Sequence, residues 1–110
     1  MPAKLLDYEV VKGEKRWTKE LKIVFNGKKI SFLTITDHYQ KDHGKVVNNE
    51  LIIRLVKKLN NKRLRPYKFI NGRKPYKWET VCQHQPYRLI FWFKDNTANH
   101  LWIRNCYPID

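Results

Sequence analysis

A β-hairpin in the first third of the chain is the feature that most restricts the fold. Residues 21–25 place Leu, Ile and Phe at alternate positions, as a half-buried strand does. Asn26-Gly27 follows, and this dipeptide suits a type I′ turn because both central positions need a positive φ. Residues 29–36 supply the returning strand. The sequence therefore predicts an antiparallel hairpin at this point.

Two helices are predicted after the hairpin. Asp37 can accept hydrogen bonds from the free amides of a first turn, which favours a short helix over residues 38–43. Asn48 or Asn49 can cap a firmer helix, because apolar residues recur at helical spacing over 51–59. The second helix would have an apolar side available for packing, whereas the first is of marginal length.

The second half of the chain predicts strands. Residues 67–81 suggest another hairpin, which two prolines should confine to the edge of a sheet. Residues 87–93 are apolar on both faces, as in a central strand, and 100–107 return antiparallel to them. Residues 1–17 show no decisive period and could form a strand or a docking helix. We expect an α+β fold with an antiparallel twisted sheet and one or two helices packed on one face.

Composition supports one folded domain over residues 1–110. A length of 110 residues suits a single core, and 42% hydrophobic with 14% aromatic residues exceeds what a disordered basic tail would show. The net charge of +13 must then lie on a folded surface. Cys82 and Cys106 lack the spacing of a zinc site and are expected to be small core residues.

One long segment carries no acidic side chain. Between Glu50 and Glu79 the chain holds ten lysines and arginines, interleaved with aromatic residues. Such cations contact phosphates, and such rings stack on bases, so nucleic acid is the favoured partner. The alternative is a solvated basic face kept for solubility. The RNA-binding candidates are Lys57, Lys58, Lys62, Arg63, Arg65, Arg73, Lys74, Tyr76, Trp78 and Arg88.

The chain shows no membrane signal. No apolar run approaches the roughly 18 residues that span a bilayer, and the N-terminal residues lack the apolar core of a secretion signal. Binding to an anionic membrane surface is less favoured, because Pro66 and Pro75 interrupt the basic segment. We expect a soluble, cytoplasmic protein.

Candidate chemistry lies first in the segment from Asp37 to His43. It holds His38, Lys41 and His43, and histidine exchanges protons near neutral pH. A metal site is not favoured, because five residues separate the two histidines and no third ligand is obvious. In the alternative interpretation Asp37 is a cap and the histidines are surface polar residues.

A second candidate site lies on the last predicted strand. His100 and Arg104 share one face, with Trp102 between them. Arginine matches phosphate oxygens with a forked set of donors, and a tryptophan offers a stacking surface. In the alternative interpretation, Arg104 and Trp102 form a cation–π pair with a purely structural role, which would give the same sequence pattern.

The order of these elements resembles a known family. The resemblance rests on two predicted strands and on the segment from Thr36 to His43. The strands are Tyr87-Arg88-Leu89-Ile90-Phe91-Trp92-Phe93 and Leu101-Trp102-Ile103-Arg104-Asn105-Cys106-Tyr107. Over roughly residues 34–108 it resembles the RelE-like branch of the barnase/EndoU/colicin/RelE toxin ribonucleases.

This resemblance implies metal-independent RNA cleavage, in which the ribose 2′-hydroxyl attacks phosphorus and leaves a 2′,3′-cyclic phosphate. It needs no cofactor. A base, an acid and cations that stabilise the phosphate are required. Tyr107 is a further candidate acid but is expected on the strand face opposite Arg104. The candidate catalytic residues are His38 or His43 as base, Arg104 with Lys41 on the phosphate, and His100 as acid.

The resemblance also implies partners. The substrate would be RNA, with ribosome-bound mRNA as one form, and an acidic antitoxin protein would cover the basic surface. Two other functions are consistent with the sequence. One is a binding module for RNA or DNA without catalysis, and the other is a toxin that inhibits a host protein such as gyrase.

Overall fold

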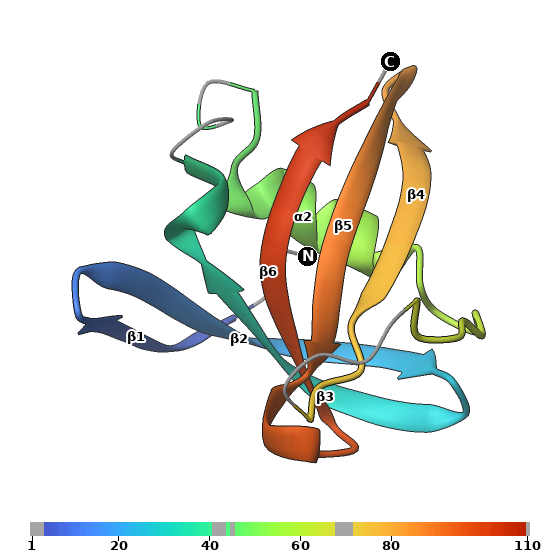
Figure 1. Ribbon diagram of the computed structural model, residues 1–110, viewed down its shortest axis with the longest axis horizontal. Helices are drawn as coiled ribbons and strands as arrows, with labels where there is room; N and C mark the ends of the chain where they lie inside the picture. The colour runs from blue at the N-terminus through green and yellow to red at the C-terminus, as the bar shows by residue number, and fades with distance from the viewer. Residues whose placement is uncertain (1–3, 41–43, 45, 68–71, 110) are drawn as a thin grey trace.

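Six strands form one curled, mixed sheet in the computed structural model, which describes residues 4–40, 44, 46–67 and 72–109. The strands are β1 (Leu5–Val11), β2 (Glu14–Phe25), β3 (Lys28–Thr36), β4 (Tyr76–Cys82), β5 (Gln85–Phe93) and β6 (His100–Pro108). Their order across the sheet is β1-β2-β3-β6-β5-β4. Neighbours are antiparallel except β3 and β6, which run parallel and join two three-stranded halves. In Figure 1, β2 and β3 run across the view, whereas β4, β5 and β6 run up it.

The hairpin at Asn26-Gly27 is confirmed. Both residues have positive φ, 53° and 72°, as a type I′ turn requires. The preceding strand is longer than predicted, because β2 begins at Glu14. The first seventeen residues, which the sequence left open, form β1 and the start of β2. A second turn with two positive φ values, at Lys12-Gly13, joins them.

The predicted helix after residue 48 is confirmed as α2 (Asn49–Lys57). Asn48 is its cap, since its Oδ1 accepts a hydrogen bond from the Leu51 amide at 2.8 Å. The apolar side, with Ile52, Leu55 and Val56, is buried. The helix passes behind β5 and β6 in Figure 1 and closes the core from that side.

The segment after β3 differs from its prediction. It forms one 3₁₀ turn, η1 (Asp37–Tyr39), in which Asp37 is the first residue and no side chain caps the turn. Residues 41–43 lie outside the described residues. Residues 68–71, which carry the turn of the other predicted hairpin, also lie outside them. Within that hairpin, β4 is confirmed as an edge strand of the sheet, starting directly after Pro75.

The α+β prediction is therefore wrong. The described residues are mostly β, with six strands in a mixed sheet and one α-helix of nine residues. The sheet is not antiparallel throughout, because β3 pairs with β6 in parallel. The error arises because the first residues add strands, and because the pairing of β3 with β6 depends on residues far apart in the chain. None of the described helices has the length and apolar character needed to cross a membrane.

Aromatic rings fill the centre of the core. Phe25 is fully buried, and its ring centroid lies 5.6 Å from that of Phe91 and 5.3 Å from that of Tyr76. Cys82 and Cys106 are free and buried, as expected. Burial raises the pKa of the Cys106 thiol to about 12, so this side chain is neutral and unreactive at physiological pH.

A β-bulge at Arg104 sets the geometry of β6. Phe91 pairs with Ile103, but Ile90 pairs with Asn105, so Arg104 is an extra residue on its strand. The hydroxyl of Thr36 donates toward the carbonyls of Ile103 and Arg104, at 3.3 and 3.4 Å, where the parallel pairing with β3 ends. The buried threonine thus fixes the bulge, and the bulge changes which later residues of β6 face outward.

The change in alternation corrects the predicted position of Tyr107. Strict alternation would put Cys106 on the outer face beside Arg104, but Cys106 is fully buried. Tyr107 instead pairs with Arg88, and its hydroxyl accepts a hydrogen bond from the Arg88 guanidinium at 3.3 Å. Tyr107 therefore lies on the outer face, contrary to expectation.

Candidate functional site

A cleft of about 630 Å³ lies on the sheet face that α2 does not cover. Strand alternation places Trp102 and Arg104 on this face, because Leu101 and Ile103 are buried in the core. The cleft is lined by Glu14, Arg16, Gly72, Arg73, Trp92, Phe93, Lys94, Asp95, Trp102 and Arg104. Its walls thus combine residues from the first strands, the segment before β4, and the turn between β5 and β6.

Small residues on β3 allow the two halves of the cleft to meet. Thr34 and Thr36 face the cleft side, and both are almost fully buried. Arg16 on β2 can therefore extend across β3, and its guanidinium carbon lies 4.9 Å from the ring centroid of Trp102 on β6. A larger residue at position 34 would stand between this arginine and the tryptophan.

A second tryptophan is covered in the same way. Trp92 on β5 lies directly opposite Trp102 in the strand register. Arg73 lies over its ring, with 4.9 Å between guanidinium carbon and centroid. The ammonium of Lys94 lies 5.8 Å from the ring centroid of Trp102. The cleft thus presents two indole rings, each with a cation above it.

Glu14 is held between two arginines. Its Oε1 accepts a hydrogen bond from Nε of Arg16 at 2.9 Å, and its Oε2 lies 3.8 Å from Nη1 of Arg104. Asp95 is the other carboxylate of the lining, against four cations. The cleft therefore has an excess of positive charge and one carboxylate beside two guanidinium groups.

No protein-family model, no curated protein and no solved structure matches this chain. A function for this protein is therefore inferred from the geometry of the cleft.

Arg104 and Arg73 are the predicted site residues that the structure brings into this cleft. Arg104 contacts Glu14, while the cations above Trp102 are Arg16 and Lys94. The alternative in which Arg104 only packs on Trp102 is therefore not what the structure shows.

His38 lies in η1, which contacts β6 and β2. Thr36, two residues earlier, pairs with Arg16 and bonds to the carbonyl of Arg104, so η1 lies next to the arginine end of the cleft. Lys41 and His43 lie outside the described residues. Within the described part of the chain, no three His, Cys, Asp or Glu side chains come together as a metal site would require.

His100 shares the cleft face of β6 but does not line the cleft. Its Nε2 is hydrogen-bonded to Thr34 Oγ1 at 2.7 Å, and Thr34 Oγ1 is bonded in turn to Thr18 Oγ1 at 2.8 Å. Burial lowers the pKa of this imidazole, and Lys94 lowers it further, while Asp95 acts in the opposite direction. His100 is thus a neutral imidazole that links three strands, which makes it a poor acid at pH 7.

The buried imidazole predicts a dependence of stability on pH. In the folded protein the pKa of His100 lies below its ordinary value of 6.5, so the unfolded chain binds more protons in acid. This contribution to the free energy of unfolding is complete above pH 6.5 and is lost as the pH falls through the folded pKa. Urea unfolding should show a loss of stability from pH 7 to 5 that His100→Gln reduces. An equal loss in both proteins would contradict this.

Several of the predicted RNA-binding residues have structural roles. Tyr76 is only 7% exposed, and its ring packs on Phe91, which leaves it no free face for a base and corrects its predicted role. Trp78 packs against the core. Arg88 forms a salt bridge with Glu79 at 2.6 Å.

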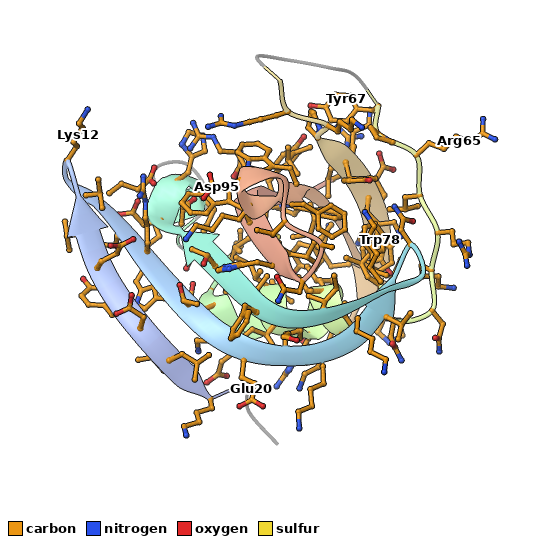
Figure 2. All side chains as sticks on the ribbon, turned by 90° about the horizontal axis from the view of Figure 1, so that it is seen from below. Lys12, Glu20, Arg65, Tyr67, Trp78 and Asp95 are labelled. Carbon is orange, nitrogen blue, oxygen red and sulfur yellow. The ribbon has the colours of Figure 1, made fainter. Side chains whose placement is uncertain are left out.

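With the exception of Arg73, the remaining predicted RNA-binding residues lie outside the cleft. Lys58 donates a hydrogen bond to the Val81 carbonyl. Figure 2 shows Arg65 and Tyr67 on the side of the molecule away from Lys12, with Asp95 between. Arg73 lines the cleft, but six other basic candidates are exposed and do not line it: Lys57, Lys58, Lys62, Arg63, Arg65 and Lys74.

Sequence reasoning missed four of the residues that shape the cleft. Glu14 and Arg16 belong to the segment whose period was undecided, and Lys15 between them is also charged, so no apolar–polar alternation is visible there. Trp92 was placed on a central strand with no role, and Lys94 lies in the following turn. The signal that could have placed them is the alternation of Leu21, Ile23 and Phe25, which puts Glu14 and Arg16 on the polar side when it is extended back along the chain.

Proposed function

We propose that this protein is a metal-independent endoribonuclease that binds single-stranded RNA in the cleft. The observation that carries the proposal is the cleft itself, in which Trp92 and Trp102 lie under three cations, Arg73, Arg16 and Lys94. Aromatic faces stack on bases whatever the sequence, and cations neutralise the phosphates. The sequence resemblance to RelE-like ribonucleases, which includes the strand that carries Trp102 and Arg104, is the reason to propose cleavage of RNA.

Glu14 is the proposed general base. Its carboxylate accepts the proton of the 2′-hydroxyl while the 2′ oxygen forms a bond to phosphorus. Among the described residues of the cleft, Glu14 is the carboxylate that directly contacts guanidinium groups, so a phosphate bound to those groups would lie beside it. This replaces the histidine base expected from the sequence.

Arg16 and Arg104 are the proposed phosphate clamp. Charge builds up on the phosphate oxygens in the pentacoordinate transition state, and guanidinium groups fixed in place stabilise that charge. The bond from phosphorus to the 5′ oxygen then breaks, and this oxygen takes a proton. We assign the proton donor to His38, because η1 lies next to the arginine end of the cleft. The products are a 2′,3′-cyclic phosphate and a free 5′-hydroxyl.

A second candidate function is RNA binding without cleavage. The 2.9 Å hydrogen bond from Arg16 to Glu14 favours it, because this carboxylate is already engaged with a guanidinium group. In that case Glu14 orients the arginine and no proton is transferred.

Cleavage of end-labelled RNA in excess EDTA tests the proposal. We expect products that end in 2′,3′-cyclic phosphate, and we expect Arg104→Ala to lower the rate by about a hundredfold. Arg88→Ala is the matched control, because this arginine is also paired with a glutamate but does not line the cleft. RNA binding without product under these conditions would support the binding module instead. Equal loss in both variants would reject a specific role for Arg104.

A further inference from the structure

We infer that the cleft holds two successive bases of one RNA strand, one on Trp92 and one on Trp102, and that the covering arginines move to the phosphates when RNA binds. This inference rests on the proposed function and specifies its substrate. The two tryptophans are cross-strand partners, so their Cβ atoms lie roughly 5 Å apart. They are close enough to hold neighbouring bases of a flexible strand.

The two rings are separate platforms. Arg73 approaches Trp92 from the segment before β4. Arg16 approaches Trp102 from β2, which belongs to the other half of the sheet. The covering groups thus come from opposite walls of the cleft. Trp92 has one cation over its ring and Trp102 has two, Arg16 and Lys94, and a base can take the place of the covering arginine.

Exchange of a base for a guanidinium is favourable. An exposed cation–π contact changes an equilibrium constant by about two- to fivefold, whereas stacking of a base on an aromatic ring changes it by about five- to a hundredfold. The displaced guanidinium also gains a charge-assisted contact with phosphate. Arg73 and Arg16 therefore protect the indole faces in the free protein and bind the backbone in the complex.

The geometry also excludes a double helix. A base within a duplex is stacked on both faces and cannot lie on an indole unless the pair opens. Two adjacent platforms require two adjacent unpaired bases. The cleft is thus specific for single strands or loops, and its minimal ligand is a dinucleotide.

A fluorescent, uncleavable RNA tests this inference. The probe is a 2′-O-methyl oligouridylate decamer with two adjacent 2-aminopurines, which lacks the attacking hydroxyl. We expect quenching of 2-aminopurine on binding, and binding weaker by about tenfold or more in Trp92→Ala and in Trp102→Ala. Trp92→Phe and Trp102→Phe retain a ring and should restore part of the affinity. Tyr8→Ala, an exposed aromatic on the edge strand β1, should bind normally.

Failure of the two-base inference and failure of the cleavage proposal would give different results. Equal affinity for the same probe annealed to its complement, or loss of quenching in only one tryptophan variant, would overturn the two-base inference even if the protein cleaves RNA. Quenched, single-strand-specific binding with no cleavage of ordinary RNA would support the two platforms and reject the nuclease. Circular dichroism of each variant confirms that the fold is retained.

Discussion

Glu14→Gln should lower RNA cleavage by about 10²- to 10⁴-fold and leave RNA binding equal or tighter. A general base contributes a factor of this size, and an amide cannot accept the proton. The same change removes a negative charge from the cleft that we propose binds a polyanion, so affinity should not fall. Cleavage should thus fall while affinity for RNA does not. Single-turnover cleavage and binding of a 2′-O-methyl RNA measure the two quantities separately.

Glu79→Gln is the control for this substitution. Glu79 also pairs with an arginine, Arg88, but neither residue lines the cleft. Its cleavage should equal that of the wild type. If Glu14 only orients Arg16 and Arg104, Glu14→Gln will weaken binding and cleavage together. That result, or full activity, would remove the assigned role of Glu14.

Phe91→Ala should lower the free energy of unfolding by about 3–5 kcal/mol. The side chain is fully buried between Phe25 and Tyr76, with ring centroids 5.6 and 5.4 Å away, so truncation leaves a cavity at the centre of the core. Such a loss is a large fraction of the roughly 5–15 kcal/mol that stabilises a folded protein. Urea unfolding followed by tryptophan fluorescence measures the change.

Val81→Ala gives the comparison for this prediction. Val81 lies on the edge strand β4 and is 52% exposed, so its truncation should cost less than about 1 kcal/mol. A similar loss in both variants would mean that burial of Phe91 is not the cause.

Local patterns predicted the local parts of the fold. Asn26-Gly27 has positive φ at both positions, and the Asn48 cap and apolar spacing gave α2. The parallel pairing of β3 with β6 could not be predicted, because it joins residues that are far apart in the sequence and meet only in the folded chain. The alternation on β1 was weak because this strand is exposed on both faces, so no side of it had to be apolar.

The site was predicted in the same uneven way. Period-two alternation correctly put Trp102 and Arg104 on one face of β6. The bulge then shifted every later residue, which is why Tyr107 was assigned to the wrong face. Glu14 and Arg16 reach the cleft through the pairing of β2 with β3 and of β3 with β6. No short-range pattern contains that information.

The β3–β6 pair also has a consequence for protein synthesis. The hydroxyl of Thr36 and the carbonyl of Arg104 that meet there are 68 residues apart, and such distant contacts form slowly during folding. Glu14 and Arg16 leave the ribosome long before Trp102 and Arg104 do, and a nascent chain without β6 also lacks the strand that joins the two halves of the sheet, so its cleft is incomplete. The RNA cleavage that we propose could therefore not act on the message that encodes the protein until that strand has emerged and docked.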